Sequence, residues 1–467
     1  MMKQFGIVTP GLLVGALIGF SDCRSRSDFV NPISTLRVVL NPDDGGKAIP
    51  QILSTATKSI DIVIYQIGDP DIQAALLAAM QRGVEVRVIM DNYASSTAVP
   101  NSAFVAAMVA ASTAAIPSTL SNFQAHWSSS NFNITHQKAI IIDANGGGSP
   151  SMVVSTGNFY SSSFGQYWTA RDFYVITGDP TLIRRAEEVF NSDFACDGNT
   201  VTNGIVGETS GPLLYSNGSL LLGTSAYPGF DDGYYPGGKA IPTPDTNQGN
   251  VGPYQVKIID SAVKGDVLSI YNEELRSDTP KVGELFGTLL AALERGVVVK
   301  IFMSAPARQS AIPPQGQDKD YVTLAAAGAE VHLLASQAWL QKSATNFPAG
   351  HPSYIHAKAF LLSDSAGAFK DGYVGSTNGS ANSIYFNREL GLALRNYPAI
   401  ANDLQSTFNQ DLAIANPEAP NAPFVFTVPM VAPTTGGLYP AGWGQSLPLV
   451  QEPSSSGFNR SACGSAF

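Results

Sequence analysis

The chain has 467 residues and a net charge of −10, with 44% hydrophobic residues but only 14% charged residues. This length and apolar content fit about two or three units of domain size and exclude general disorder. Three cysteines exclude a disulfide-framework miniprotein, and the acidic balance argues against a broad electrostatic grip on nucleic acid, which needs a basic face.

An apolar stretch, 5–20, lies close to the amino terminus. Its 16 residues are fewer than the about 20 that a membrane span needs, and they suit the apolar core of a secretory signal. Gly19 and Ser21 are small residues at the −3 and −1 positions of a cleavage after Ser21. We therefore predict a signal peptide over 1–21 and a secreted or periplasmic protein. A lipoprotein that carries its lipid on Cys23 and an uncleaved membrane anchor remain alternatives.

The body of the chain opens with a strand, a helix and a second strand. The β-branched run 60–65 predicts a strand, and helix-forming residues then continue to Arg82. Gly83 ends this helix, because glycine readily adopts the backbone conformation found at helix C-termini. The alternating run up to Met90 predicts a buried strand. Strand, helix and strand in this order indicate a parallel α/β unit.

A group of polar residues, the first motif, follows. It consists of His136 and Lys138, a predicted strand that ends at Asp143, and the run Ser155-Thr156-Gly157-Asn158. Residues i and i+2 of a strand face the same side, so His136 and Lys138 are expected to point into one space. Asp172 follows 36 residues after the histidine, within a short apolar run, and is expected to stand behind an imidazole.

The body of the chain is duplicated. Residues 76–90 (LLAAMQRGVEVRVIM) and 289–303 (LLAALERGVVVKIFM) are identical at nine of fifteen positions, at a constant offset of 213. The end of each copy is marked by Phe190-Asn191-Ser192-Asp193 and by Phe408-Asn409-Gln410-Asp411. We therefore divide the chain into an N-terminal half 36–200, a connecting loop region 201–250, a C-terminal half 251–415 and a Pro-rich tail 416–467.

The second half carries the same motif. His356 and Lys358 precede a predicted strand, and Gly375-Ser376-Thr377-Asn378 follows that strand. Histidine and asparagine are 22 residues apart in both motifs, which chance does not explain in a duplicated chain. Glu389 follows its histidine by 33 residues and is expected, like Asp172, behind an imidazole.

Paired histidines, lysines and asparagines in this pattern indicate phosphoryl transfer. One imidazole attacks phosphorus, and the other protonates the leaving alcohol and then deprotonates the incoming water or alcohol. The lysines and asparagines stabilise charge on the non-bridging oxygens, and a carboxylate fixes the tautomer of each imidazole. This chemistry requires no metal and no cofactor. The predicted catalytic residues are His136, Lys138, Asn158, His356, Lys358 and Asn378, and the predicted orienting carboxylates are Asp172 and Glu389.

These residues resemble the phospholipase D superfamily, whose signature is His-x-Lys-x4-Asp followed by a Gly/Ser-rich segment that ends in Asn. The first motif matches throughout, whereas the second has Ser363 at the Asp position and Asp364 one residue later. The resemblance implies that Asp143, Ser363 and Asp364 are structural. It also implies an α/β fold with two pseudo-twofold-related α/β/α halves, each a mixed β-sheet flanked by helices, and one active site at their interface.

The resemblance further implies a phospholipase D-type phosphodiesterase that hydrolyses glycerophospholipids, with or without transphosphatidylation, through a phosphohistidine. By this analogy His136 is the nucleophile and His356 the acid/base, although the residues alone do not separate the two roles. A secreted metal-independent nuclease and a catalytically inactive binding protein of the same fold remain alternatives, and a metal phosphoesterase is the rival enzyme class.

Export and the lack of an evident basic track favour phospholipid over nucleic acid as the substrate. Aromatic residues flank the motifs and suit acyl chains, a choline cation or stacked bases. They are Phe159, Tyr160, Tyr167, Trp168, Tyr354, Tyr385 and Phe386. We expect a monomer that meets phospholipid at a membrane or vesicle surface.

Five further residues have alternative interpretations. His126, His332 and His351 are expected to be structural or loop residues, although His126 and His351 lie shortly upstream of the motifs and are also candidates to line the active-site cleft. Cys196 and Cys463 either pair in an oxidising compartment or remain free thiols.

Overall fold

The computed structural model describes residues 36–44, 46–91, 100–115, 122–128, 134–159, 170–195, 221–223, 251–277, 282–305, 317–335, 352, 354–380, 383–384, 387–394, 397–414 and 424–430. All of them belong to one compact unit, Asn31–Phe467. The predicted signal peptide, the three cysteines, His351 and most of the predicted connecting region and tail lie outside the described residues.

The duplicated segment forms the predicted strand, helix and strand in both halves. In the first half these are β2 (Ser59–Ile64), α2 (Pro70–Gln81) and β3 (Glu85–Met90), and in the second β9 (Val267–Tyr271), α7 (Val282–Glu294) and β10 (Val298–Ser304). Gly83 and Gly296 follow the two helices at φ of 88° and 82°. These left-handed conformations suit glycine and let the chain turn back into the next strand.

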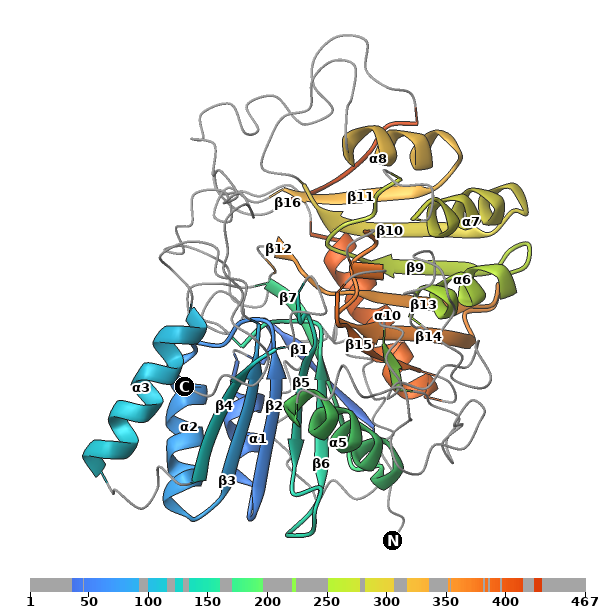
Figure 1. Ribbon diagram of the computed structural model, residues 1–467. Coiled ribbons are helices and arrows are strands. Elements are labelled where there is room, and N and C mark those ends of the chain that lie inside the picture. Colours follow the sequence, from blue (N-terminus) through green and yellow to red (C-terminus); the bar gives the residue numbers. More distant parts are fainter. Residues whose placement is uncertain are drawn as a thin grey trace, which may run out of the picture. The chain divides into compact units, whose positions relative to one another are not determined.

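The first sheet is mixed (Figure 1). In spatial order its strands are β1 (Arg37–Asn41), β7 (Ala170–Thr177), β6 (Ser151–Ser155), β5 (Lys138–Ile142), β2, β3 and β4 (Phe123–Trp127). The strands β2, β3 and β4 are parallel, whereas β5 pairs antiparallel with β2. An eighth strand, β12 (Tyr354–Ile355), comes from the second half and pairs with β7.

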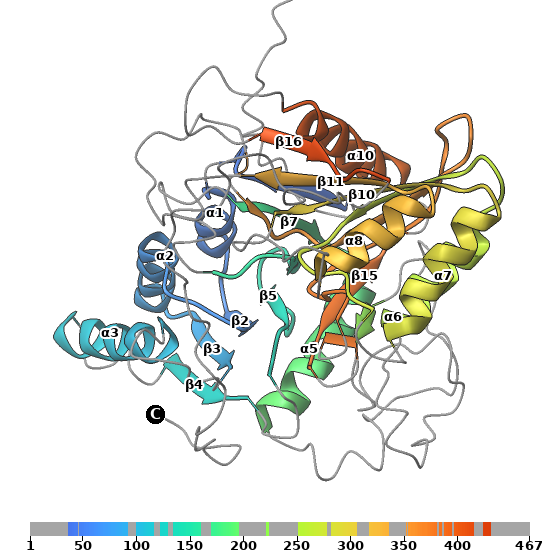
Figure 2. The same ribbon diagram turned by 90° about the horizontal axis from the view of Figure 1, so that it is seen from above.

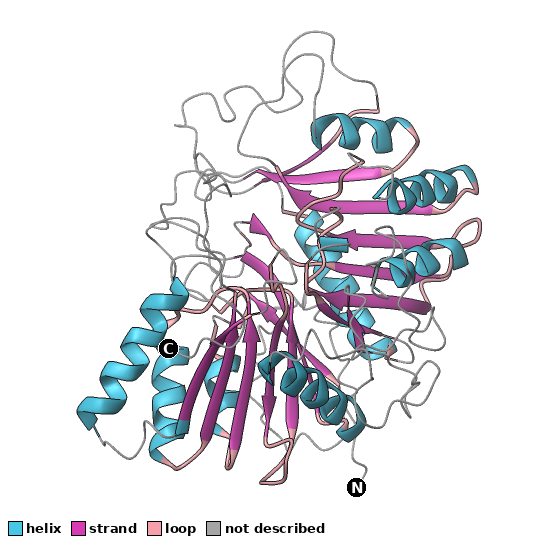
Figure 3. Cartoon of the chain, in the orientation of Figure 1, coloured by secondary structure: helices cyan, strands magenta, loops and turns pink. Residues whose placement is uncertain are grey.

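The second sheet has the equivalent strands in the same order when it is followed from the opposite edge. This confirms the predicted pair of mixed sheets (Figure 3). Its strands are β16 (Phe424–Thr427), β11 (Glu330–Ala335), β10, β9, β13 (Ala359–Ser363), β14 (Phe369–Gly375), β15 (Leu390–Ala393) and β8 (Leu221–Gly223). The two edge strands, β8 and β16, come from segments that the sequence assigns to the connecting region and the tail. Each protects a sheet edge by pairing with it.

Helices cover both faces of each sheet, and three apolar cores result (Figures 1 and 2). Helices α1 (Ala48–Ser54), α2 and α3 (Pro100–Ala115) pack on the first sheet, and α6 (Val251–Ser261), α7 and α8 (Gln317–Ala326) pack on the second. The third core joins α5 (Pro180–Ala195) and α10 (Pro398–Leu412) to strands of both sheets. Burial of apolar surface therefore links the two halves. No helix in the described ranges has the length and hydrophobicity to span a membrane.

Candidate active site

Both motif histidines lie just before a strand. Strand β5 begins at Lys138 and β13 begins at Ala359, so the expectation that each histidine lies on a strand is wrong. The reason is that their backbones pair with the opposite half. The amide of His136 donates to the carbonyl of Arg388 at 2.8 Å, and the amide of His356 donates to the carbonyl of Arg171 at 3.2 Å.

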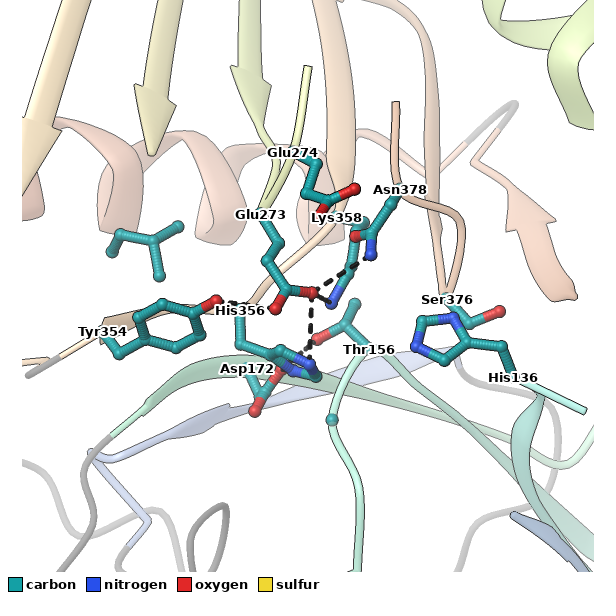
Figure 4. Close-up of polar contacts among 12 residues, drawn as sticks. His136, Thr156, Asp172, Glu273, Glu274, Tyr354, His356, Lys358, Ser376 and Asn378 are labelled. Carbon is teal, nitrogen blue, oxygen red and sulfur yellow. Dashed lines mark hydrogen bonds and ion pairs between the residues drawn. The ribbon is translucent and has the colours of Figure 1, made fainter. Parts of the chain in front are cut away.

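Each imidazole donates through Nδ1–H to a carboxylate of the other half. Figure 4 shows His356 beside Asp172. His136 lies 2.9 and 3.0 Å from the two oxygens of Glu389, and His356 lies 2.9 Å from Asp172. In the sequence each carboxylate follows the histidine of its own half. This spacing does not show that each carboxylate binds the histidine of the other half. Because the carboxylate holds the proton on Nδ1, Nε2 of the neutral ring carries the lone pair.

Each carboxylate is held by its own half before it receives the imidazole. The hydroxyl of Thr156 donates to Asp172 at 2.8 Å, and the hydroxyl of Ser376 donates to Glu389 at 2.5 Å. A Cβ added at Gly157 would lie 2.5 Å from the carboxyl carbon of Asp172. Glycine is therefore required in the first motif, because any side chain would displace this carboxylate.

Both motif lysines are fully buried. Nζ of Lys138 donates to the carbonyl of His136 at 2.6 Å and lies 5.6 Å from the centre of the Tyr65 ring. Nζ of Lys358 forms an ion pair with Glu273 at 2.9 Å. Burial of an ammonium group is costly, so these contacts stabilise the charged forms.

Each motif asparagine follows the lysine of its motif in the sequence. The two asparagines have different contacts. Asn378 donates through Nδ2 to Glu273 at 3.2 Å (Figure 4). Asn158 is buried, and in both asparagines Oδ1 has no hydrogen-bond partner among the described residues. A buried amide group with an unused hydrogen-bonding atom is available to a ligand.

Glu273 and Tyr65 are site residues that the sequence analysis missed. Each follows the first strand of the duplicated strand–helix–strand segment, β9 and β2 respectively, and each contacts the motif residues of its half. Polar or aromatic residues directly after the carboxyl ends of parallel strands commonly line ligand sites, and that signal was present in both segments.

Burial lowers the pKa of His136 to about 4, and the charges of Lys138 and Lys358 contribute, while Glu389 opposes the shift. Burial also lowers the pKa of Lys138 to about 7. Burial alone would raise the pKa of Glu389, but its contacts with His136, Lys138 and Ser376 lower it. At neutral pH the site therefore presents a neutral His136 imidazole beside an ionised Glu389.

Two buried arginine–aspartate pairs connect the halves at equivalent positions. Arg171 donates to both oxygens of Asp411 at 2.6 and 2.7 Å, and Arg388 donates to both oxygens of Asp193 at 2.9 and 3.2 Å. Each arginine directly precedes an orienting carboxylate in the chain. Asp193 and Asp411, at the ends of the two sequence copies, thus pair the halves. The sequence analysis assigned them no role.

The Asp position of the motif is structural in the first half. Asp143 is buried and accepts the backbone amides of 57–59 at 2.7–3.1 Å. Burial opposes ionisation, but these hydrogen bonds outweigh it and lower the pKa of Asp143. In the second half the strand register shifts between Leu362 and Ser363, and Asp364 accepts the amides of Ala366 and Ala368 in the following turn. The displaced aspartate therefore stabilises a local turn.

Of the remaining candidates, Tyr354 reaches the site through its hydroxyl, which donates to Glu273 at 2.6 Å, whereas the contacts described do not bring the others into it. His126 stacks on Phe194 at 4.0 Å, and His332 contacts Thr427. Phe159 is fully buried, and Tyr354 lies 6.1 Å from the His356 ring. Tyr160, Tyr167, Trp168, Tyr385 and Phe386 lie outside the described residues. No group of three or more His, Cys, Asp and Glu residues in the described ranges is arranged to hold a metal ion.

Two segments, 49–194 and 257–412, match the profile of the family described as "Cardiolipin synthase, PLD-like domain". The chain belongs to this family, and thereby to the phospholipase D superfamily, whose enzymes act on phosphodiesters. The matched segments fall within the two halves predicted from the duplication. No curated protein matches the chain in sequence.

A solved phosphatidylserine synthase shares the fold, and two further solved structures are similar to the chain at lower TM-scores. Phosphatidylserine synthase of Haemophilus influenzae Rd KW20 is 11% identical with a TM-score of 0.53, over 80% of this chain and 85% of that one. Polyphosphate kinase of Porphyromonas gingivalis is 14% identical with a TM-score of 0.48, and the chain spans 53% of the kinase's length while 83% of this chain is covered. Nuc of Salmonella typhimurium, a phospholipase D family member, is 22% identical with a TM-score of 0.28, over 34% of this chain and 94% of that one.

Proposed function

We propose that the chain is a phospholipase D-type phosphodiesterase that hydrolyses glycerophospholipids through a phosphohistidine on His136, with or without transfer to an alcohol. The observation that carries the proposal is the pair of imidazoles from two halves, each anchored through Nδ1 by a carboxylate. Such an anchored ring presents Nε2 in a fixed tautomer to a reacting atom. The charges of Lys138 and Lys358 act on His136, which supports a shared site.

The proposed reaction has two steps. In the first, Nε2 of His136 attacks phosphorus, the bond from phosphorus to the head-group oxygen breaks, and His356 donates its Nε2 proton to that oxygen. In the second, water gives a proton to His356 and attacks phosphorus, which releases phosphatidic acid and restores His136. An alcohol in place of water gives a new phosphatidyl ester. The lysines and asparagines of both motifs donate to the non-bridging oxygens.

Several features support a phospholipid as the substrate. The matching family carries cardiolipin synthase in its description. A net charge of −10 provides no evident basic track for a polyanion. The ring of Tyr354 lies 6.1 Å from that of His356, where it suits a head-group cation. We further propose that 1–21 directs export and that a monomer meets phospholipid at a membrane or vesicle surface.

Parallel incubation with phospholipid and DNA tests this substrate class. We expect the purified protein to release phosphatidic acid from mixed phosphatidylcholine, phosphatidylethanolamine and phosphatidylglycerol vesicles, and to form phosphatidylethanol when ethanol is added. The His136→Ala variant should form neither product, whereas His332→Ala, which changes a histidine that contacts Thr427, should retain both activities. Cleavage of single-stranded DNA without lipid turnover would establish the nuclease instead.

Activity is expected to persist in EDTA. The reason is that Lys138, Lys358, Asn158 and Asn378 provide the charge stabilisation that a metal ion would otherwise supply. Initial rates measured before and after dialysis against EDTA should agree within about twofold. A metal phosphoesterase predicts complete loss and recovery on addition of a divalent cation, and that outcome would contradict the proposed mechanism.

A further inference from the structure

Tyr65 and Glu273 occupy equivalent positions in the two halves. Ile67 and Leu275 each form a parallel β-bridge to the residue that follows the motif asparagine of their half. Tyr65 and Glu273 each come two residues before these bridges. The duplicated site therefore has an uncharged aromatic side chain in one half and a carboxylate in the other.

Glu273 binds the motif residues of its half through one oxygen (Figure 4). Its Oε2 lies 2.9 Å from Nζ of Lys358, 3.2 Å from Nδ2 of Asn378 and 3.5 Å from Nε2 of His356. The other oxygen, Oε1, accepts the hydroxyl of Tyr354 at 2.6 Å. The carboxylate is thus fixed in direct reach of the reactive nitrogen of His356.

The two histidines consequently differ in what faces their Nε2. His356 has a carboxylate at each ring nitrogen, Asp172 at Nδ1 and Glu273 at Nε2. Among the residues that the structure describes, His136 has a carboxylate at Nδ1 only, and the Tyr65 ring packs against it edge-on at 5.2 Å. We propose that Glu273 is a positioning residue that keeps a proton on both nitrogens of His356, and so makes His356 the proton donor and leaves His136 as the nucleophile.

The charges around the site favour a positive charge on one of the two imidazoles. In the described part of the chain, the carboxylates of Asp172, Glu273 and Glu389 surround the imidazoles together with the ammonium groups of Lys138 and Lys358. These carboxylates outnumber the lysines, so the local charge favours a protonated imidazole. A phosphodiester brings one more negative charge, which further favours a protonated imidazole.

The titratable and charged groups facing His356 come from four segments. They are Asp172 on β7, Tyr354 on β12, Lys358 before β13, and Glu273 after β9, with Glu274 next to Glu273. Lys358 opposes a proton on His356, but it forms its ion pair with Glu273 at 2.9 Å. Burial raises the pKa of Glu273, but the contacts with Lys358 and His356 outweigh it and hold this pKa well below its ordinary range. Glu273 is therefore ionised at the pH of any assay near neutrality.

The role of Glu273 rests on the proposed phosphohistidine reaction, but its protonation effect is measurable without a substrate. Diethyl pyrocarbonate acylates only neutral imidazole. The side chains of His136 and His356 are 8% and 10% exposed, so access alone does not separate them. At pH 6 we expect His136 to be modified at least about tenfold faster than His356, with the sites mapped by mass spectrometry of the intact chain's peptides.

Variants at Glu273 then isolate its charge. In Glu273→Gln, His356 should react at least about tenfold faster than in the wild type, while Glu273→Asp should restore the slow rate. Glu274→Gln removes a neighbouring carboxylate that pairs with Arg276 and should leave the order of modification unchanged. Circular dichroism and thermal unfolding verify that each variant folds.

Equal modification rates of His136 and His356 in the wild type would overturn the inference, even if Glu273→Gln fails to fold. An unchanged His356 rate in a folded Glu273→Gln would also overturn it. Absence of turnover on phospholipid and DNA would instead remove the proposed function and leave the modification order as a separate result. In an active enzyme, a rapid quench should place the phosphoryl group on His136 in the wild type and on both histidines in Glu273→Gln.

Discussion

Replacing Asp411 with alanine is expected to lower the free energy of unfolding by up to about 3–5 kcal/mol, because the buried guanidinium of Arg171 loses the carboxylate that accepts two of its hydrogen bonds and, among the described residues, keeps only Asp43 and the carbonyl of Asn41. Arg171 is 2% exposed and donates two hydrogen bonds to Asp411, which also accepts the hydroxyl of Tyr271 at 2.7 Å. Urea unfolding followed by circular dichroism measures the change.

The equivalent pair and a surface pair provide the controls. Asp193→Ala should cost less than Asp411→Ala, because the side chain of Asp193 is 17% exposed and water can solvate the arginine it leaves. Glu330→Ala breaks an ion pair with Lys300 at 3.2 Å between partly exposed side chains, and should change the unfolding free energy by less than about 1 kcal/mol. Equal effects of Asp411→Ala and Glu330→Ala would show that the buried pair does not hold the halves together.

Replacing His136 with alanine is expected to lower kcat by about 10⁴-fold or more, because the nucleophile of the proposed reaction is lost. His356→Ala removes the proton donor and should lower kcat by about 10²–10⁴-fold on a phospholipid. The two variants are distinguished by a p-nitrophenyl phosphodiester, whose leaving group departs without a proton.

On that activated substrate, phosphorylation of the His356→Ala enzyme should approach the wild-type rate, whereas His136→Ala should remain inactive. Burst kinetics of p-nitrophenol release measure the step directly. If His136→Ala shows the burst and His356→Ala does not, the two roles are reversed. His332→Ala, at a histidine on β11, serves as the matched control.

Sequence reasoning predicted the architecture because the decisive signals were local or repeated. The run up to Gly83 and its copy up to Gly296 specify helix ends through a backbone conformation that glycine favours. The equal spacing of the two motifs then indicated that each half contributes one copy of the site residues. Neither signal depends on knowing how the halves pack, and both sheets and their flanking helices follow from such local patterns.

The exchange of carboxylates could not be predicted in the same way. His136 and Glu389 are 253 residues apart, and only the docking of the halves decides which carboxylate meets which imidazole. The same docking takes the histidines out of the strands, because their amides bond to the opposite half. Glu273 was overlooked because it has no counterpart in the first half, where the equivalent residue is Tyr65, and a search for repeated residues discards such differences.

The exchanged carboxylates also determine when the site is complete during synthesis. A ribosome that has finished 36–200 has made His136 and Lys138, yet Glu389 is encoded almost two hundred residues later. Asp172, made early, receives its imidazole only when His356 has emerged. The nascent chain thus carries His136, the proposed nucleophile, without its orienting carboxylate until nearly the whole second half has been translated and folded. Translation products that end before His356 therefore lack both imidazole–carboxylate pairs, and those that end between His356 and Glu389 still lack the pair of His136.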